Sequence, residues 1–143
     1  MHYPALGSGV TGVDDIAGVL SMFAIDVSGE FCASHQLRLP MGGLEPLHGH
    51  NWRVRVRVGA PQLDDLETVM DFHVLEAALA TIIGSFNNRH LNDIPPFDAA
   101  YNPSAERVAQ RIAELLAPHI APTARLIHVK ISEAVGCRAL FLP

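Results

Sequence analysis

The stretch HGHNWRVRVRV, residues 48–58, alternates between two kinds of side chain. One parity holds two histidines and a run of apolar residues: His48, His50, Trp52, Val54, Val56 and Val58. The other parity holds Arg53, Arg55 and Arg57. A period of two predicts a β-strand with one buried face and one face in water. Both histidines therefore lie on the face that we expect to be buried.

A second alternating stretch, residues 23–35, precedes the first and also ends in a histidine on its apolar face. That face carries Phe23, Ile25, Val27, Phe31, Ala33 and His35. The opposite parity carries Asp26, Ser28 and Glu30, and we predict a β-bulge at Gly29. The segment between the two stretches, residues 39–46, is rich in proline and glycine, which indicates a loop. A hairpin of the two strands would bring His35 close to His48 and His50.

Two helical patterns follow. The first begins after Asp71 and has an apolar stripe formed by Phe72, Leu75, Leu79, Ile82 and Ile83. The second has Asn102 as its expected N-cap, Pro103 in its first turn, and a stripe formed by Val108, Ile112, Leu115 and Leu116. Both helices are expected to pack on the sheet.

The end of the chain alternates again. Ile127, Val129, Ile131 and Glu133 share one face, and a turn at Gly136 leads into a short strand through Leu140 and Phe141. The predicted order is β-β-α-α-β-β, which indicates a single α+β domain.

Composition narrows the classes of partner. The 143 residues are 49% hydrophobic and 17% charged, as in one globular domain. Residues 1–12 lack the pattern of a signal peptide, and no segment is long and apolar enough to span a bilayer, so we expect a soluble, cytoplasmic protein. Cys32 and Cys137 are too few for a disulfide framework. The formal net charge of −5 leaves no polybasic surface, so we expect no nucleic-acid or membrane partner and favour a small molecule.

The three histidines carry the strongest chemical signal. Zinc prefers imidazole nitrogens at about 2.0–2.1 Å in a tetrahedral array, and three protein ligands with an open fourth position are typical of catalytic sites. His48 and His50, two apart on a strand, can reach one ion, and His35 faces the same core. We therefore predict a Zn²⁺ site. The alternative is that they are core histidines that only form hydrogen bonds, because His-Gly-His alone is not specific.

Several motifs, taken in order, resemble the 6-pyruvoyl-tetrahydropterin synthase and 6-carboxy-tetrahydropterin synthase family. They are FCASH at 31–35, LHGHN at 47–51, VMDF at 69–72, LND at 91–93, NPSAE at 102–106, and Glu133 eight residues before Phe141. The resemblance covers residues 18–143 and leaves 1–17 as an N-terminal extension. It implies the tunnelling fold, a four-stranded antiparallel sheet with two helices on one face.

The same resemblance implies a homo-oligomer. Trimers of such subunits close a barrel, two trimers stack as a hexamer, and the active sites lie between subunits. Arg53, Arg55 and Arg57 would then face the central channel, although an ordinary solvated sheet face explains them nearly as well.

The resemblance also implies roles for individual residues. Glu133 is similar to the family's pterin anchor, whose carboxylate accepts two hydrogen bonds from the ring; the alternative is a solvated residue at a strand end. The family's usual cysteine base is replaced here by Leu44, but Glu45 matches a subgroup with the pattern Glu-x-x-His-Gly-His. Glu45 is therefore the candidate base. Cys32 has the parity opposite to His35 and is expected to be a small packed residue.

The family's Asp-His proton relay is missing, because Asn87 and Asn88 occupy its place. His90 is the candidate replacement, or else an exposed loop histidine. The favoured function is a zinc-dependent lyase that acts on the side chain of a 7,8-dihydropterin, namely 7,8-dihydroneopterin or its triphosphate. The alternatives are a non-catalytic protein that binds zinc and pterin, and a different zinc-assisted reaction on a related heterocycle. The sequence leaves the exact substrate and product open.

Overall fold

Two strands of 13 residues each, β1 (Phe23–His35) and β2 (His48–Ala60), form a long antiparallel hairpin in the computed structural model, which describes residues 22–143. The register pairs His35 with His48, Ala33 with His50, and Phe31 with Trp52. The predicted hairpin is thus confirmed, and the three histidines meet at its loop end. The predicted extension, residues 1–17, lies outside the described residues.

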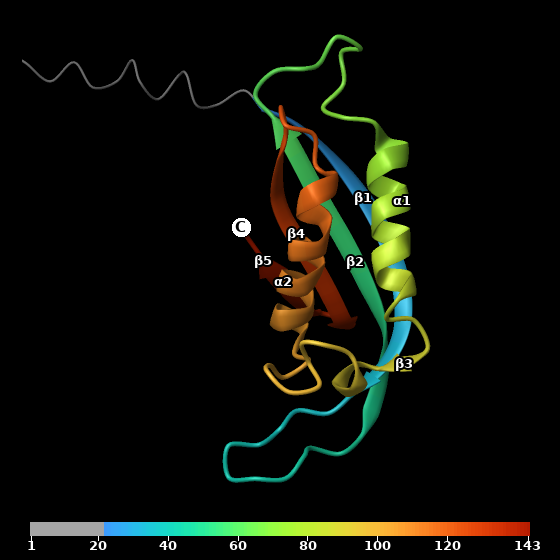
Figure 1. Cartoon of the computed structure of the whole chain (residues 1–143), viewed down its shortest axis with the longest axis vertical. Coiled ribbons are helices and arrows are strands. Elements are labelled where there is room, and N and C mark those ends of the chain that lie inside the picture. The colour runs from blue at the N-terminus through green and yellow to red at the C-terminus, as the bar shows by residue number, and fades with distance from the viewer. Residues whose placement is uncertain (1–21) are drawn as a thin grey trace, which may run out of the picture.

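The hairpin is the centre of a sheet with the order β3-β1-β2-β4-β5. β4 (Arg125–Ala134) and β5 (Cys137–Phe141) extend it in antiparallel fashion on the β2 side (Figure 1). These four strands, β1, β2, β4 and β5, agree with the predicted ones. The two-residue strand β3 (Arg89–His90), parallel to β1, was not predicted, so the sheet has five strands in place of the expected four.

Hydrogen bonds between the loop after α1 and strand β1 position β3, and the sequence shows no periodic pattern for them. The Asn88 N–H donates to the Cys32 carbonyl, and the Asn87 Oδ1 accepts from the Cys32 N–H at 2.9 Å. Two residues are too few to show alternation, so sequence periodicity could not reveal this strand.

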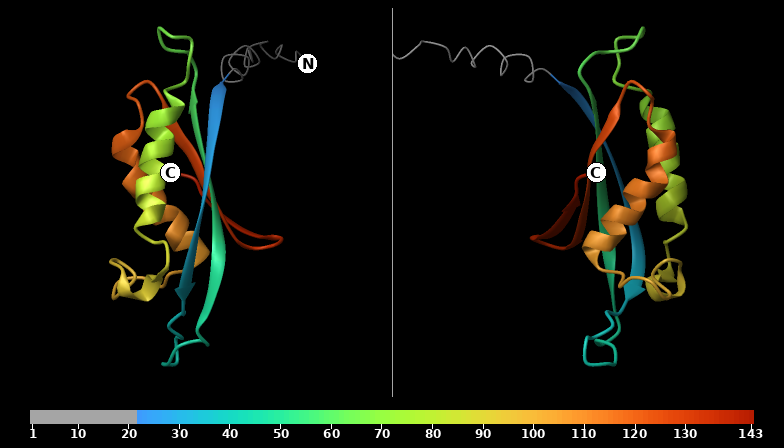
Figure 2. Two further views of the ribbon diagram at one scale, coloured as in Figure 1. Left: turned by 90° about the vertical axis from the view of Figure 1, so that its right-hand side faces the viewer. Right: turned by 60° about the vertical axis from the view of Figure 1, so that its left-hand side comes forward.

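Both helices lie on one face of the sheet (Figures 1 and 2), as predicted. α1 (Phe72–Gly84) begins where expected, because the Asp71 side chain caps it by accepting from the His73 N–H. Its buried stripe consists of Leu75, Ala78, Leu79, Ile82 and Ile83. Phe72 was assigned to this stripe, but it lies in the first turn, beyond the packed part of the helix, and is 48% exposed.

α2 (Ala105–Leu116) begins later than predicted, and its N-cap is Ser104 rather than Asn102. The Ser104 side chain accepts from the Arg107 N–H. The Asn102 side chain instead accepts from the Arg38 N–H at 2.7 Å and donates to the Arg38 carbonyl at 3.1 Å. Asn102 therefore ties the loop after β1 to the start of α2. Short 3₁₀ helices, η2 (Leu91–Asp93) and η3 (Ala117–His119), flank these segments.

The core lies between the helices and the sheet. Its largest fully buried side chains include Trp52, Phe31, Leu75, Leu79, Ile112 and Ile131. The centroids of the Trp52 and Phe31 rings are 5.8 Å apart in a stacked arrangement. None of the helices within residues 22–143 is both long and apolar enough to cross a membrane.

The opposite face of the sheet is not covered by helices (Figure 2). The side chains of Arg53, Arg55 and Arg57 are exposed there, which confirms the predicted parity. Arg57 forms a two-pronged ion pair with Asp26, with both contacts at 2.8 Å, and this hydrogen bonding lowers the pKa of Asp26. Arg53 pairs with Glu30 at 3.0 Å.

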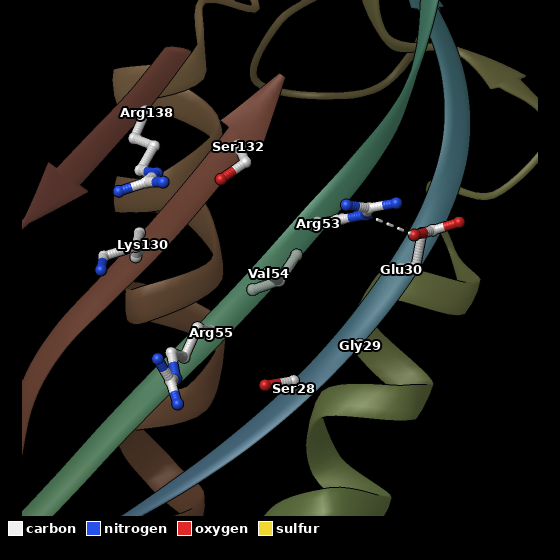
Figure 3. A pocket seen from close by; sticks show the side chains of 9 residues that line it. All are labelled: Ser28, Gly29, Glu30, Arg53, Val54, Arg55, Lys130, Ser132 and Arg138. Atoms are coloured by element: carbon white, nitrogen blue, oxygen red, sulfur yellow. Dashed lines mark hydrogen bonds and ion pairs between the residues drawn. The ribbon is translucent and has the colours of Figure 1, made fainter. Parts of the chain in front are cut away.

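The open face also contains a shallow hollow of about 610 Å³ (Figure 3). Four basic side chains line it. Arg53 and Arg55 come from β2, Lys130 comes from β4, and Arg138 comes from β5. A chain with a net negative charge thus concentrates part of its positive charge on one sheet face.

Gly29 does not form the predicted bulge, because the β1–β2 register runs through it without interruption and pairs it with Val54. The reason for a glycine is the close approach of α1. A Cβ atom at this position would lie 2.5 Å from the Cδ1 atom of Ile83. Gly29 therefore lets the helix pack directly on the strand.

We expect Gly29→Ala to be less favourable in the parent protein than in an Ile83→Val background, by about 1 kcal/mol of unfolding free energy. Ile83→Val removes the Cδ1 atom, which lies 2.5 Å from the position of the new Cβ, so the overpacking is relieved. Urea unfolding of the parent, both single variants and the double variant measures the coupling. Additivity within about 0.3 kcal/mol would show that the two sites do not interact.

Candidate metal centre

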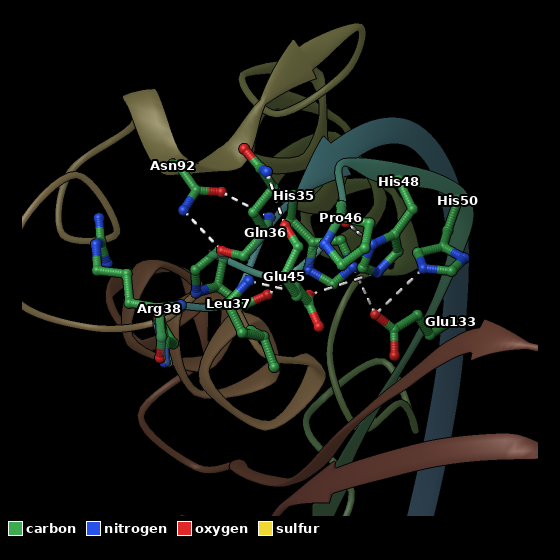
Figure 4. Close-up of polar contacts among 12 residues, drawn as sticks. His35, Gln36, Leu37, Arg38, Glu45, Pro46, His48, His50, Asn92 and Glu133 are labelled. Atoms are coloured by element: carbon green, nitrogen blue, oxygen red, sulfur yellow. Dashed lines mark hydrogen bonds and ion pairs between the residues drawn. The ribbon is translucent and has the colours of Figure 1, made fainter. Parts of the chain in front are cut away.

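The rings of His35, His48 and His50 gather at the loop end of the hairpin (Figure 4). The centroid of the His35 ring lies 4.5 Å from that of His48 and 5.2 Å from that of His50. The His48 and His50 centroids are 5.0 Å apart. The strand register thus brings together the three residues that the sequence pattern selected.

Two of the rings are oriented by backbone carbonyls. The His35 Nδ1 lies 2.7 Å from the Pro103 carbonyl oxygen, and the His48 Nδ1 lies 2.8 Å from the Pro46 carbonyl oxygen. Because a carbonyl can only accept, each Nδ1 carries a proton, and in a neutral imidazole the Nε2 then carries the lone pair. This is the tautomer in which an imidazole binds a metal through Nε2.

Trp52 supports the cluster from the core side. It is fully buried, and its indole N–H donates to the Ala33 carbonyl at 3.1 Å. Its ring contacts the rings of His35 and His50 edge to face, at centroid distances of 4.8 Å and 5.6 Å. The two histidines are therefore packed against a rigid surface.

Glu133 joins the histidines from the end of β4. Its Oε1 lies 2.9 Å from the His35 Nε2 and 3.5 Å from the His50 Nε2 (Figure 4). One potential ligand atom from each of His35, His48, His50 and Glu133 lies within 4.8 Å of the other three. A tetrahedral ion with bonds of about 2.05 Å needs ligand atoms about 3.3 Å apart, so this donor set fits one zinc ion.

The contact between His35 and Glu133 is not an ordinary hydrogen bond. Burial lowers the pKa of His35, although the Pro103 carbonyl and the Glu133 charge oppose the shift, and this direction favours the neutral imidazole. Its proton is on Nδ1, which leaves a lone pair on Nε2 facing a carboxylate oxygen. The Nε2 atoms of His35 and His50 are buried without a hydrogen-bond partner among residues 22–143. A cation between these atoms would satisfy both nitrogens and the carboxylate.

Glu45 opens onto a pocket of about 290 Å³ that His35, His48 and Glu133 also line. The Glu45 Oε1 accepts from the Leu37 N–H at 2.9 Å and lies 3.7 Å from the His48 Nε2. Its carbonyl oxygen accepts from the Gln36 side chain at 2.8 Å. These bonds hold the loop before His48 and direct a partly exposed carboxylate toward the histidine cluster.

His90 lies elsewhere. It is in β3, and its Nδ1 is 3.1 Å from the Ser34 hydroxyl oxygen, on the edge of the sheet next to β1. Asn87 and Asn88 bind the backbone of Cys32, as described above. Cys32 is exposed rather than packed, because its parity places it on the face without helices.

Sequence reasoning missed the residues that complete the centre from other elements. The carbonyls of Pro103 and Pro46 leave no mark in the sequence, because every residue has a carbonyl. The approach of Glu133 to the histidines did have a signal. Glu133 continues the apolar face of Val129 and Ile131, as the histidines continue theirs.

Known proteins share both sequence and fold with this chain. Residues 24–142 match the model of the family described as 6-pyruvoyl tetrahydropterin synthase. The 6-carboxy-5,6,7,8-tetrahydropterin synthase of Helicobacter pylori strain J99 is 33% identical over 63 residues, which are 43% of this chain and 32% of that protein. The chain thus matches about a third of the length of this curated relative.

Two solved structures have the same fold. The 6-pyruvoyl tetrahydropterin synthase of Caenorhabditis elegans has a TM-score of 0.73 and 18% identity, covering 86% of this chain and 96% of that chain. A Plasmodium vivax 6-pyruvoyltetrahydropterin synthase, in which a glutamate described as a catalytic residue is replaced by cysteine, has a TM-score of 0.68 and 17% identity, covering 85% and 97%. These likenesses confirm the expected tunnelling fold. Because the family match covers most of its residues, the chain belongs to the 6-pyruvoyl tetrahydropterin synthase family.

Proposed function

We propose that this protein is a zinc-dependent lyase that acts on the side chain of a 7,8-dihydropterin, either 7,8-dihydroneopterin or its triphosphate. One observation carries the proposal. The Glu45 carboxylate lines one pocket together with His35 and His48, and its Oε1 lies 3.7 Å from the His48 Nε2. Proton abstraction from a substrate held at a metal centre requires a base beside that centre.

In this proposal His35, His48 and His50 hold the zinc ion through their Nε2 atoms. Zinc, when bound, polarises the hydroxyl groups of the substrate side chain and so acidifies the neighbouring C–H. Trp52 and the carbonyls of Pro103 and Pro46 keep the imidazoles in the orientation that this requires.

Glu45 is the proposed base. The Leu37 N–H holds one of its oxygens, which fixes the carboxylate and leaves the other oxygen available to take a proton. A glutamate is described as catalytic in the Plasmodium vivax relative, which supports a glutamate base in this fold. The equivalence of that glutamate with Glu45 is part of the proposal.

Glu133 is the proposed pterin anchor. A carboxylate matches the two adjacent donors of the ring, N3–H and the 2-amino group, in a bidentate way. Glu133 lines the pocket of the histidine cluster, so a pterin bound there would be within its reach.

His90 as a second proton-transfer group, the trimer or hexamer with active sites between subunits, and a cytoplasmic location stay predictions. Within one chain His90 contacts Ser34 rather than the histidine cluster, so it would serve a site only if that site lies at a subunit boundary. The non-catalytic alternative is favoured by one observation, namely that Asn87 and Asn88 cannot shuttle protons at neutral pH.

Removal of one histidine should remove the metal. We expect the parent to bind about one zinc per chain and His48→Ala to lose most of it on dialysis, because the variant lacks one of the three imidazoles of the donor set and binds the ion more weakly. His73→Ala is the matched control, since the His73 side chain is 90% exposed on α1. Metal analysis after dialysis measures the zinc content. A full equivalent of zinc retained in His48→Ala would refute the ligand assignment.

Loss of the Glu133 carboxylate should abolish pterin binding but leave the metal site occupied at saturating zinc. We expect Glu133→Ala to abolish detectable binding of 7,8-dihydroneopterin, while three histidines still take up one zinc at saturating metal. Calorimetry gives the pterin affinity, and metal analysis gives the zinc content. An unchanged pterin affinity contradicts the anchor role.

Neutralising the base should slow turnover with little change in binding. Glu45→Gln can still accept from the Leu37 N–H, so the loop should keep its shape. We expect turnover of dihydroneopterin to fall by about 10² to 10⁴, as for loss of a general base. Glu76→Gln, which neutralises an exposed carboxylate on α1 away from the pocket, should stay near the parent rate.

Chromatography of the products measures all three rates. If Glu45→Gln is as fast as the parent, Glu45 is not the base. If neither protein turns over and both bind the pterin, the non-catalytic alternative replaces the lyase.

A further inference from the structure

Glu133 has been assigned two roles above, as a member of the donor set and as the proposed pterin anchor. Its carboxylate lies among the metal donors, 2.9 Å from the His35 Nε2 and 3.5 Å from the His50 Nε2. These distances bracket the separation of about 3.3 Å between ligand atoms of a tetrahedral zinc ion. In this position Glu133 would be the fourth ligand and would close the metal to other molecules.

The anchor role needs a different position of the same side chain. The two donors that a carboxylate would bind, N3–H and the 2-amino group, are on the pyrimidine ring of a pterin. The side chain that the metal would bind is on the other ring, at C6. A carboxylate in contact with the metal cannot at the same time pair with the far edge of a molecule whose C6 side chain occupies that metal.

We propose that Glu133 exchanges between these two positions. It is the fourth metal ligand when no pterin is bound, and it leaves the metal to pair with the ring when a pterin enters. This inference rests on the proposed function. In the exchange, the metal has four protein ligands when no pterin is bound. A coordination position becomes free only when Glu133 pairs with the pterin ring.

The backbone around Glu133 suits such an exchange. Ser132 pairs with Arg138 and Ala134 pairs with Cys137, so Glu133 is an extra residue between two consecutive pairs of the β4–β5 ladder. Such a bulge changes the direction of a side chain and often lies next to an active site. The Glu133 side chain is 27% exposed, and within residues 22–143 its carboxylate has ion-pair contacts only with the two histidines. No other bond within that part of the chain needs to break when it moves.

Competition for one carboxylate has a thermodynamic consequence. If zinc holds Glu133, a pterin that can bind only through its ring edge must first displace this carboxylate from the metal. Bound zinc should therefore lower the affinity of the protein for that pterin. By linkage, the bound pterin should lower the affinity for zinc by the same factor. An anchor that never contacts the metal predicts no such coupling.

The first test measures zinc affinity without pterin, by competition with a chromogenic chelator. We expect Glu133→Gln to bind zinc at least about tenfold more weakly than the parent, since even partners outside the ligand set change metal affinity by 10- to 100-fold. Glu106→Gln removes a charge from the same pocket but not from the donor set, and it should stay within about twofold of the parent. Equal zinc affinities of Glu133→Gln and the parent would overturn the proposal.

The second test uses pterin with hydrogen at C6, which has no hydroxyl to offer the metal. We expect the zinc-free parent to bind it at least about fivefold more tightly than the zinc-loaded parent, the lower end of usual coupling between sites. Equal affinities overturn the exchange and leave the proposed function standing. If this pterin binds neither form, the exchange is overturned, and the anchor in the proposed function fails with it.

Discussion

The register of the β1–β2 hairpin is the constraint on which the rest of the structure depends. It pairs the last residue of β1, His35, directly with the first residue of β2, His48. Because side chains alternate along a strand, a slip of one residue would move a whole set of side chains to the other face. The valines and Trp52 would then lie in water, and the arginines would lie under the helices. The burial that drives folding therefore also fixes the position of the metal donors.

The same alternation of side chains gives the two faces of this sheet different chemical properties. The face toward the helices is apolar along most of its length and ends in histidines, so the donors are partly removed from water. The open face carries Arg53, Arg55 and Arg57, whose pairs with Asp26 and Glu30 cross from β2 to β1. Exposed ion pairs of this kind add little stability, so the apolar face is the main source of the sheet's stability.

Electrostatics at the histidine cluster favour a candidate cation site over a packed group of core side chains. A neutral imidazole whose proton points at the Pro103 carbonyl cannot donate to Glu133, yet the two polar atoms lie 2.9 Å apart. Such an arrangement is unfavourable without positive charge between the atoms. A metal ion would supply that charge and would also satisfy the two buried nitrogens of His35 and His50, which lack a hydrogen bond within the described residues.

The sequence by itself determined the long strands, both helices, and the inward parity of His35, His48 and His50. These features are periodic or local, so each can be recognised from residues a few positions apart. Other features come from contacts between segments far apart in the chain. Ser104 rather than Asn102 caps α2, because Asn102 is taken by the backbone of Arg38, 64 residues away.

The same holds at the site, where the Pro103 carbonyl orients His35 across 68 residues. Gly29 is needed because α1 crosses β1 closely, and β3 exists because Asn88 reaches the Cys32 carbonyl. The sequence placed Glu133 on the apolar face of its strand, but only the assembled sheet brought its carboxylate onto the histidines. Alternation specifies which way a side chain points, whereas its neighbours depend on how the layers pack.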